Sequence, residues 1–596
     1  MVFRKSRARK AQRIGSTALS AVILMIAAAC SDDDTDTPPV PSPPPPPPPP
    51  PVTMVPEVTL QAIGVFETGI FDEGAAEIVA FDPGTDQLFV INSNDTTVDI
   101  LDLTDPTAPA LVDQIDASAL GGGANSVAVS GDMFAVAIEA DDATDPGLVA
   151  FFNASSLELD GTVTVGALPD MVTFTPDGQT VLVANEGEVS DDLQTNPVGS
   201  VSVIDISSGV ATAVAETADF LEFNDDRAEL IAAGVRLNQP DFNGVADPLT
   251  VDVSTLPPVS VAQDLEPEFI AVAPDGTTAF VSLQENNAFA VVDIEQVAVT
   301  EIISFGTVDH SIAGNEFDPN DDDGINIVNA PVRGLRMPDA IAVYEVDGNV
   351  FMVTANEGDG REFEFEDPAT GDDEVVFTDV IDVDDGVAEG AFDASLDAAA
   401  LTALNDLEVS RTDGDADGDG DIDEIFAFGS RSFSIIDPTG TVVFDSGSMF
   451  ETMTADLFPD DFNSTNDENG SFENRSDDAG PEPEGVTIGV IDGVTLAFIG
   501  LERIGGIMVY DITDPTAVAF EDYINVRDFT VDVTVDDDGD GEGDSTNSAA
   551  GDLGPEGLAF ISAADSPSGV PLLAVGNEVS GTTRIFQVNL EMVPES

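Results

Sequence analysis

The sequence predicts an all-β protein, folded as a single β-propeller of about seven blades with long acidic loop insertions. Two observations predict this fold: a repeated pattern of short apolar strands, and turns such as Asp177-Gly178 and Asp275-Gly276 between them. The hydrophobic fraction of 42% is enough for a large core, so the acidity of the chain belongs to its surface. A parallel β-helix or a row of β-sandwiches is the alternative, but a β-helix has shorter and stricter repeats.

Each repeat begins with a proline and an acidic residue and continues into three apolar strands. Five such pairs occur: Pro169-Asp170, Pro267-Glu268, Pro338-Asp339, Pro483-Glu484 and Pro555-Glu556. Less regular units cover residues 77–103 and 125–159, and residues 425–447 would complete a blade that an insertion interrupts. Because a propeller closes by pairing its two chain ends in one blade, we expect residues 58–66 to lie beside residues 583–590.

The first thirty residues resemble a bacterial lipoprotein signal. A basic leader precedes an apolar stretch, residues 18–29, and then Cys30, the only cysteine of the chain. Residues 1–29 would be removed as a signal peptide, and a lipid on Cys30 would attach the protein to a membrane of the bacterial cell envelope, at the outer membrane or the cell surface. An ordinary secretory signal or a short membrane anchor is the alternative, although the apolar stretch is shorter than the ~20 residues that span a bilayer.

A tether follows Cys30. Residues 30–56 are acidic and then almost entirely proline, with an unbroken run from Pro43 to Pro51. Such a segment adopts an extended polyproline II conformation and would act as a semi-rigid spacer, although a proline run can also bind an aromatic groove. The propeller would then cover residues 57–596, with an insertion at residues 359–423.

Acidic residues dominate the charge of the chain. It has 115 Asp and Glu against 17 Lys and Arg, and a formal net charge of −98. Six of these 17 cations lie in the leader, which leaves 11 in the mature protein, all of them arginine. This composition excludes nucleic acid as a primary partner, because nucleic acid needs a basic face, and it favours cations such as Ca²⁺.

One loop in the insertion has the composition of a calcium site. Oxygen ligands at alternate positions, with glycines between them, suit a tight loop around one Ca²⁺. The candidate ligands are Asp413, Asp415, Asp417, Asp419, Asp421, Asp423 and Glu424. One register begins at Asp413 and closes with Glu424, and the other begins at Asp415. Residues 536–542 and 318–326 are weaker candidates, and a solvated acidic loop is the alternative.

Equivalent ends of successive blades surround one face of a propeller, so acidic residues at those ends should converge there. The expected ligand-binding residues are Glu186, Glu357, Arg361, Arg431, Glu502, Glu556 and Glu578. Carboxylates mixed with arginine can hold a metal ion together with a phosphate or carboxylate. They can also form salt bridges that only connect the blades.

Several motifs resemble those of a known family. Residues 419–424, 429–434, 474–478, 480–486, 500–503, 505–511, 554–557 and 576–581 are similar to the choice-of-anchor I family of surface proteins. The resemblance implies a propeller-like fold attached to a surface by one of several kinds of anchor. Some members are called alkaline phosphatase or mesenchyme-specific cell surface glycoprotein. Residues 482–485 are also similar, over a shorter stretch, to propeller phytase-like esterases.

The sequence leaves two functions open. The first is a lipid-anchored, calcium-stabilised propeller that binds a ligand or partner at the cell surface without turnover. The second is a metal-dependent phosphoester hydrolase, in which Glu482 and Glu484 would bind metal or act as a base and Arg475 or Arg503 would hold phosphate. A serine triad is not expected, because His310, the only histidine, lies outside the repeats.

Overall fold

The computed structural model describes residues 54–535, 543 and 545–594. The predicted signal peptide, Cys30, nearly all of the predicted tether and the acidic run 536–542 lie outside these residues. Strand β1 (Met54–Glu67) begins before the predicted start of the propeller, so residues 54–56 belong to a sheet. None of the described helices is long and apolar enough to cross a membrane.

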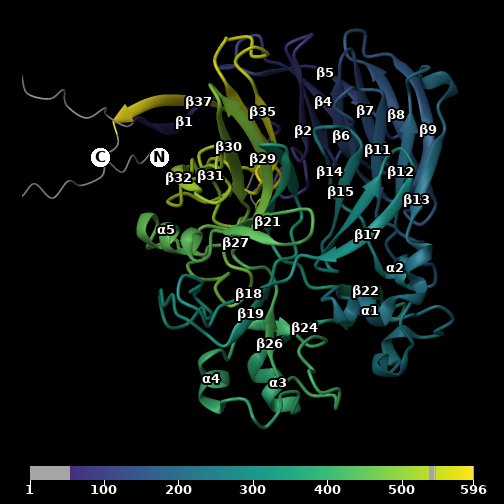
Figure 1. Cartoon of the computed structure of the whole chain (residues 1–596), viewed down its shortest axis with the longest axis vertical. Helices are drawn as coiled ribbons and strands as arrows, with labels where there is room; N and C mark the ends of the chain where they lie inside the picture. The colour runs from purple at the N-terminus through teal and green to yellow at the C-terminus, as the bar shows by residue number, and fades with distance from the viewer. Residues whose placement is uncertain (1–53, 536–542, 544, 595–596) are drawn as a thin grey trace, which may run out of the picture.

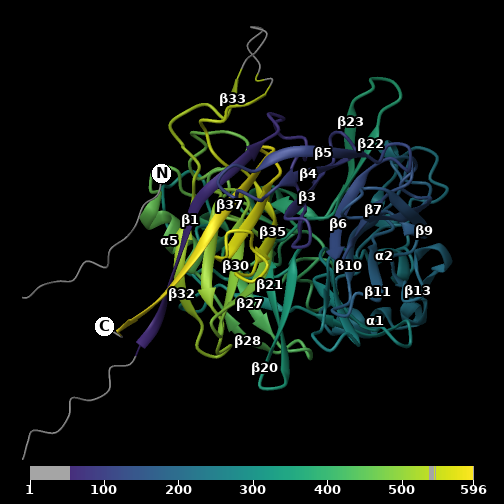
Figure 2. The same cartoon turned by 90° about the horizontal axis from the view of Figure 1, so that it is seen from above.

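Most strands belong to sheets of four antiparallel strands, and the described residues contain seven of these sheets (Figures 1 and 2). The first four are β2 (Val79–Asp82), β3 (Gln87–Asn92), β4 (Thr97–Asp102) and β5 (Ala110–Asp116); β6 (Ala124–Ser130), β7 (Met133–Ile138), β8 (Pro146–Asn153) and β9 (Leu159–Ala167); β10 (Pro169–Phe174), β11 (Thr180–Asn185), β12 (Ser200–Asp205) and β13 (Ala215–Asp219); and β14 (Ile270–Val272), β15 (Thr278–Leu283), β16 (Ala288–Asp293) and β17 (Ala298–Ser304).

The other three sheets are β20 (Ile341–Val346), β21 (Asn349–Asn356), β27 (Ser432–Ile436) and β28 (Val442–Asp445); β29 (Pro483–Ile491), β30 (Val494–Leu501), β31 (Ile507–Asp511) and β32 (Ala519–Ile524); and β35 (Pro555–Ile561), β36 (Leu572–Asn577), β37 (Thr582–Pro594) and β1. The predicted units at the Pro-acid pairs coincide with the third to seventh sheets. We number the sheets in this order.

Smaller elements fill the connections. The short strands are β18 (Thr307–Asp309), β19 (Val332–Leu335), β22 (Glu362–Glu366), β23 (Asp373–Thr378), β24 (Val380–Asp382), β25 (Glu408–Ser410), β26 (Ile425–Ala427), β33 (Thr534–Val535) and β34 (Ser545–Thr546). The α-helices are α1 (Arg227–Ala232), α2 (Val261–Asp264), α3 (Val383–Glu389), α4 (Ala398–Ala403) and α5 (Met449–Leu457), and 3₁₀ turns occupy Val210–Thr212, Leu221–Asp225, Pro248–Thr250 and Val253–Thr255.

Strands from the two ends of the described chain meet in the seventh sheet (Figure 2). β1 pairs antiparallel with β37, with Val58 opposite Leu590 and Phe66 opposite Thr583, so the predicted pairing of residues 58–66 with residues 583–590 is confirmed. The first strands of successive sheets contact one another in the order β2, β6, β10, β14, β20, β29 and β35, and β35 contacts β2 again. The fold is therefore all-β and propeller-like.

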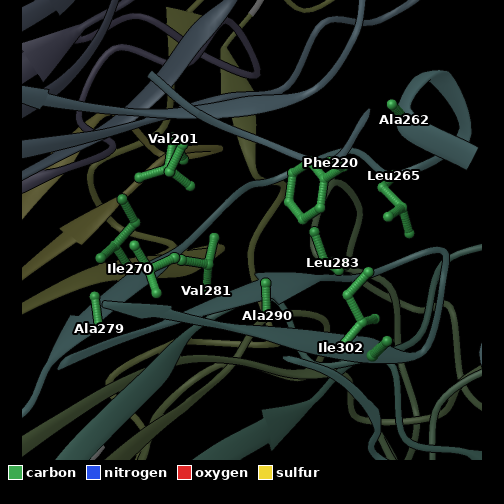
Figure 3. Packing of buried hydrophobic residues seen from close by; sticks show 14 of the residues in the cluster. Val201, Phe220, Ala262, Leu265, Ile270, Ala279, Val281, Leu283, Ala290 and Ile302 are labelled. Atoms are coloured by element: carbon green, nitrogen blue, oxygen red, sulfur yellow. The ribbon is translucent and has the colours of Figure 1, made fainter. Parts of the chain in front are cut away.

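Apolar side chains pack between neighbouring sheets. One cluster joins the third and fourth sheets and contains Val201, Phe220, Val281 and Leu283, with Ile302 at its edge (Figure 3). Complete burial of an aliphatic or aromatic side chain of this size contributes roughly 1.5–3 kcal/mol. These contacts fix each sheet against the next and so fix the positions of the loops at the strand ends.

A long insertion interrupts the fifth sheet. β21 ends at Asn356, and its neighbour β27 begins only at Ser432. The expectation that the blade resumes at Ile425 is wrong, because Ile425–Ala427 form β26, which pairs in parallel with β19 in a separate three-stranded sheet. An apolar segment of this length predicts a strand but does not show which partner that strand takes.

Candidate functional site

Acidic side chains gather where the first strands of the sheets meet. A cavity of about 620 Å³ lies there, which we call the central cavity. Its acidic lining residues are Glu77, Asp170, Asp339, Glu357, Glu484 and Glu556, and they come from five of the sheets described above. Asn125 and Gln284 contribute uncharged polar side chains from two further sheets. No arginine is among the described residues that line this cavity, so carboxylates face one another without a counter-charge.

A recurring backbone irregularity places these acids. The ladder register shifts between Pro169 and Val172, between Pro483 and Val486, and between Pro555 and Leu558. The residues before three of the prolines, Leu168, Met337 and Glu482, have positive φ angles of 46°, 42° and 47°. A register shift of this kind re-aims a side chain, and positive φ at a non-glycine residue costs about 1–3 kcal/mol. The same costly backbone geometry thus recurs at these strand starts.

Burial and mutual repulsion raise the pKa of the cavity carboxyl groups. Burial is the larger cause and nearby carboxylates add to it, so the pKa of Glu77, Asp170 and Asp339 rises to about 7 in each case. The same two causes raise the pKa of Glu484 and Glu556 well above the ordinary value. A cation that entered the cavity would relieve this repulsion.

A second cavity of about 400 Å³ shares Glu357 with the central cavity and contains arginines. We call it the arginine cavity; its charged lining residues are Glu186, Glu188, Glu266, Glu285, Glu357, Asp359, Arg361, Glu362, Glu408, Arg475, Asp478, Glu482 and Arg503. Arg475 Nη2 donates to Glu482 Oε1 at 2.6 Å, and Arg503 Nε donates to Glu482 Oε2. Burial acts to raise the pKa of Glu482, but the two guanidinium groups outweigh it and the pKa is lowered.

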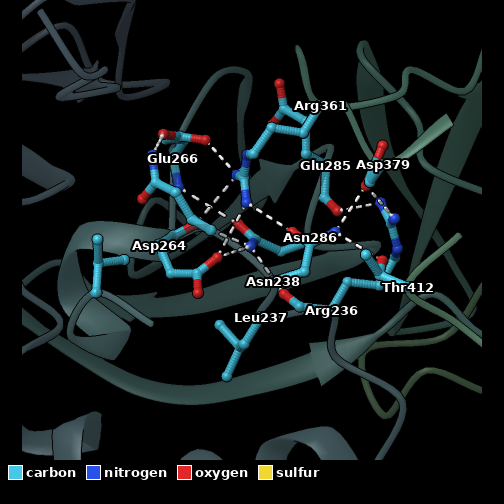
Figure 4. A network of polar contacts seen from close by, with 12 residues as sticks. Arg236, Leu237, Asn238, Asp264, Glu266, Glu285, Asn286, Arg361, Asp379 and Thr412 are labelled. Carbon is cyan, nitrogen blue, oxygen red and sulfur yellow. Dashed lines mark hydrogen bonds and ion pairs between the residues drawn. The ribbon is translucent and has the colours of Figure 1, made fainter. Parts of the chain in front are cut away.

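Arg361 lines the arginine cavity, but other residues of the protein hold its guanidinium group (Figure 4). It donates to Asp264 Oδ1 at 3.0 Å, to Asn238 Oδ1 at 3.1 Å and to Glu266. Its side chain is 3% exposed. Arg361 therefore connects the insertion to the segment that precedes the fourth sheet.

Arg431 and His310 lie in a different buried environment. Arg431 donates to Glu451 Oε1 at 2.6 Å and to the carbonyl oxygen of Asp318 at 2.7 Å. Its guanidinium group lies over the ring of Phe317, and the His310 ring packs against the same phenyl ring at a tilt of 47°. Burial lowers the pKa of His310 to about 4, so its imidazole is neutral near pH 7. Neither side chain is among the described residues that line the two cavities.

The structure brings most of the sequence-predicted site residues together. Glu357, Glu484 and Glu556 line the central cavity, and Glu186, Glu357, Arg361, Arg475, Glu482 and Arg503 line the arginine cavity. Glu502 offers a carboxylate oxygen within 4.8 Å of oxygens of Glu357 and Glu482. Glu578 is close enough to Glu484 and Glu556 to contribute to their raised pKa.

Sequence reasoning missed Glu77 as a site residue. It follows Ala76 and not a proline, so it lacks the Pro-acid signature. Its position just before β2 is equivalent to that of Asp339 just before β20. Alignment of the irregular first unit on the later repeats could have found it.

The acidic loop 413–424 folds around its own side chains. Two groups of carboxylates have oxygens within 4.8 Å of one another: Asp415, Asp417 and Asp423, and Asp393, Asp421 and Asp423. Asp419 Oδ1 accepts from the backbone N–H of Asp421 at 3.3 Å. Asp413 instead accepts from Arg236 Nε at 2.8 Å, and Glu424 accepts from Arg333 Nε at 3.0 Å. The first and last candidate ligands of the register that begins at Asp413 are therefore both paired with arginine.

These features define a β-propeller-like protein with an acidic cavity at the meeting point of its sheets. The model of the choice-of-anchor I domain matches residues 77–515. The chain belongs to the choice-of-anchor I family, and the resemblance inferred from its motifs is confirmed.

Two relatives match parts of the chain. Gigasin-3a of Magallana gigas is 29% identical over 190 residues, which cover 31% of this chain and 64% of that protein. Mesenchyme-specific cell surface glycoprotein of Strongylocentrotus purpuratus is 27% identical over 211 residues, which cover 30% of this chain and 26% of that protein. The chain thus spans less than two thirds of the length of either relative.

Solved structures are similar at low sequence identity. Hydrazine synthase of Kuenenia stuttgartiensis is 11% identical, with a TM-score of 0.39 and coverage of 89% of this chain and 97% of that chain. The β-propeller domain of Cps50 (Swd1) of Myceliophteria thermophila is 9% identical, with a TM-score of 0.39 and coverage of 89% and 100%.

Proposed function

We propose that the protein is a lipid-anchored, calcium-stabilised propeller that binds a positively charged ligand in its central cavity at the cell surface. The observation that carries this proposal is the convergence of six carboxylates from five sheets, without an arginine among the described lining residues. Buried like charges are costly unless a counter-charge neutralises them. A ligand that carries positive charge would therefore gain more from this cavity than a neutral or anionic one.

In this proposal the seven four-stranded sheets of the described residues are the blades of one propeller, and the acidic insertions are loops on its rim. The closed order of contacts among the first strands, from β2 through β35 and back to β2, supports the arrangement. The central cavity then lies on the propeller axis, where side chains from separate blades reach the same ligand.

A Ca²⁺ ion in the acidic loop would stabilise the insertion. Asp415, Asp417 and Asp423 would supply three of the six to eight oxygen ligands that Ca²⁺ takes. Asp413 connects the loop to the segment before the fourth sheet, because it accepts from Arg236, and Arg236 also donates to Asp379 in the same insertion. Order in the loop would thus support the network that holds Arg361.

The proposed location is the surface of a bacterial cell. Family membership and the printed name of the sea urchin relative support a surface location. A lipid on Cys30 would provide the anchor, and the proline-rich residues that follow would hold the propeller away from the membrane.

Calorimetric titration of the mature chain with spermidine and with trilysine tests the cationic-ligand proposal. We expect saturable binding that weakens by about tenfold in the double variant Asp170→Asn/Glu556→Gln. The matched control is Asp113→Asn/Glu345→Gln, which removes the same charges from exposed positions and should leave binding unchanged. Absence of binding by both probes, or equal weakening in both double variants, would contradict the proposal.

A metal-dependent phosphoester hydrolase is the second candidate. It is favoured by Arg475 and Arg503, whose side chains are 22% and 27% exposed in the arginine cavity that Glu357 also lines. A screen of phosphomonoesters and phosphodiesters with Ca²⁺, Mg²⁺ or Zn²⁺ separates the two functions. If the protein turns over a substrate, and Glu484→Gln and Arg475→Ala abolish this turnover but still fold, the function is catalysis and not binding.

A further inference from the structure

Glu357 lies at the junction of the two cavities and lines both of them. Two groups of three carboxylates have ligand oxygens within 4.8 Å of one another: Asp339, Glu357 and Glu484, and Glu357, Glu482 and Glu502. Glu357 belongs to both groups. The fifth sheet supplies Asp339 and Glu357 and the sixth supplies the other three, so both groups lie where these sheets meet.

Glu502 gives an independent indication of a ligand at this junction. Its side chain is 6% exposed, and its Oε1 accepts from Asn466 Nδ2 at 2.9 Å and lies 2.8 Å from Arg503 Nη1. Its Oε2 is buried and has no hydrogen-bond partner among the described residues, and the same is true of Glu484 Oε2. Buried carboxylate oxygens without partners are rare in native proteins because each carries a desolvation cost. Coordination of a cation would satisfy both oxygens.

The two groups differ in their electrostatic surroundings. Asp339 and Glu484 line the central cavity, where no arginine is among the described lining residues. Glu482 accepts hydrogen bonds from Arg475 and Arg503, whose charges oppose a further cation. The group with Asp339 and Glu484 should therefore bind the first cation, and the group with Glu482 and Glu502 should bind a second one more weakly.

We infer that Glu357 is the shared ligand of two adjacent divalent-cation positions, one completed by Asp339 and Glu484 and the other by Glu482 and Glu502. Ligand sets made only of carboxylate oxygens suit Ca²⁺, Mg²⁺ and Mn²⁺. The inference rests on the proposed function, because it assigns a chemical class to a cation that the central cavity binds.

Titration with Mn²⁺, followed by calorimetry and electron paramagnetic resonance, tests the inference. The parent is the mature chain with Asp415→Asn and Asp423→Asn, which weakens the acidic loop as a competing site. We expect two ions of unequal affinity at the junction, and a spectrum of two spin-coupled ions when both positions are filled. Each variant is compared with this parent, so metal bound elsewhere cancels.

Substitutions separate the two positions. Glu357→Gln should lose both ions and the coupled spectrum. Glu484→Gln should lose the more tightly bound ion, and Glu502→Gln should lose only the more weakly bound ion. Glu345→Gln is the matched control, because Glu345 is exposed on β20, and it should retain both ions. Circular dichroism and melting curves verify folding, and if Glu357→Gln does not fold, the other two variants decide.

A coupled spectrum that persists in Glu357→Gln would overturn the bridging role. Retention of both ions in Glu484→Gln and Glu502→Gln would overturn the site itself. If spermidine binds and no Mn²⁺ is lost in any of the variants, the inference fails and the proposed cationic-ligand function stands. If neither probe binds the parent, both fail.

Discussion

The outer turns and the central cavity use the same acidic side chains in opposite ways. In the turns, Asp105, Asp275 and Asp514 each accept hydrogen bonds from the backbone N–H and the hydroxyl group of a threonine two residues later. These hydrogen bonds lower the pKa of the three carboxyl groups. In the cavity, burial first and neighbouring carboxylates second raise the pKa of residues such as Asp170 and Asp339 to about 7. An ionised acid thus stabilises a turn and destabilises the empty cavity.

This difference shows how function can be separated from composition in a very acidic chain. The net charge of −98 belongs to the whole chain and does not distinguish the outer turns from the central cavity. What separates them is local: an acid two residues before threonine completes a turn, whereas Asp170, Asp339, Glu484 and Glu556, each after a proline, line the cavity. The following predictions test this distinction, from the largest expected effect to the smallest.

The largest effect is expected where a cavity acid is already paired. Glu482→Gln should lower the free energy of unfolding by about 3 kcal/mol, because it removes the buried carboxylate that two guanidinium groups share and leaves each of them with one carboxylate partner, Asp478 for Arg475 and Glu502 for Arg503. Glu484→Gln, which removes an unpaired carboxylate nearby, should be neutral or stabilising. Urea unfolding of both variants in chelator measures the contrast, and equal destabilisation would show that pairing with arginine does not distinguish these two acids.

Calcium should produce the next largest effect. At 100 times its dissociation constant, one bound ion raises the free energy of unfolding by about 2.7 kcal/mol, so chelator should lower the melting temperature. The shift should shrink in Asp415→Asn/Asp423→Asn. A melting curve that does not respond to chelator would remove the structural calcium from the proposal.

A pH dependence follows from the raised pKa of Asp170. Its folded pKa is about 7 against an ordinary value of 3.8, so the folded state binds more protons between these pH values and stability falls as the pH rises. Asp170→Asn should raise the free energy of unfolding at pH 8 by about 2 kcal/mol and have no effect near pH 4. Thermal melts from pH 4 to pH 8 in chelator measure this change, and a destabilising effect at pH 8 would contradict it.

The smallest effect, with the opposite pH dependence, is expected in the outer turns. Hydrogen bonds from Thr277 lower the pKa of Asp275 in the folded state. The ionised Asp275 carboxylate therefore adds to the free energy of unfolding above pH 3.8, and this stabilisation is lost as the pH falls through the folded pKa. Asp275→Ala should lower the free energy of unfolding by less than about 0.5 kcal/mol at pH 7. A stabilisation at pH 7 would mean that the turn acids behave like the cavity acids.

Much of the fold could be predicted because the repeats are local in sequence. A Pro-acid pair, an alternating strand and a turn lie within one short stretch, and the pairing of β1 with β37 follows from the closure rule. The partner of β26 could not be predicted, because β19 lies far away in the chain and pairs with it in parallel.

The candidate site was predictable only as a set of residue types. The repeated sequence pattern predicted that Glu357, Glu484 and Glu556 lie together. No local sequence feature distinguishes Arg361 from Arg503, although Asp264 and Glu266 hold the guanidinium group of Arg361 and the side chain of Arg503 is partly exposed. The partners of an arginine depend on segments that are distant in sequence and adjacent in space. A structure is needed to say which arginines are free to meet a ligand.

The β1–β37 pairing also has a consequence for biosynthesis. Asn589 Nδ2 donates to the carbonyl oxygen of Thr59 across 530 residues of sequence, so β1 must wait for a strand that is made much later. Contacts this distant form slowly, and edges left open in the meantime are prone to aggregate. The edge of β1 therefore stays unpaired in a nascent polypeptide until β37 emerges.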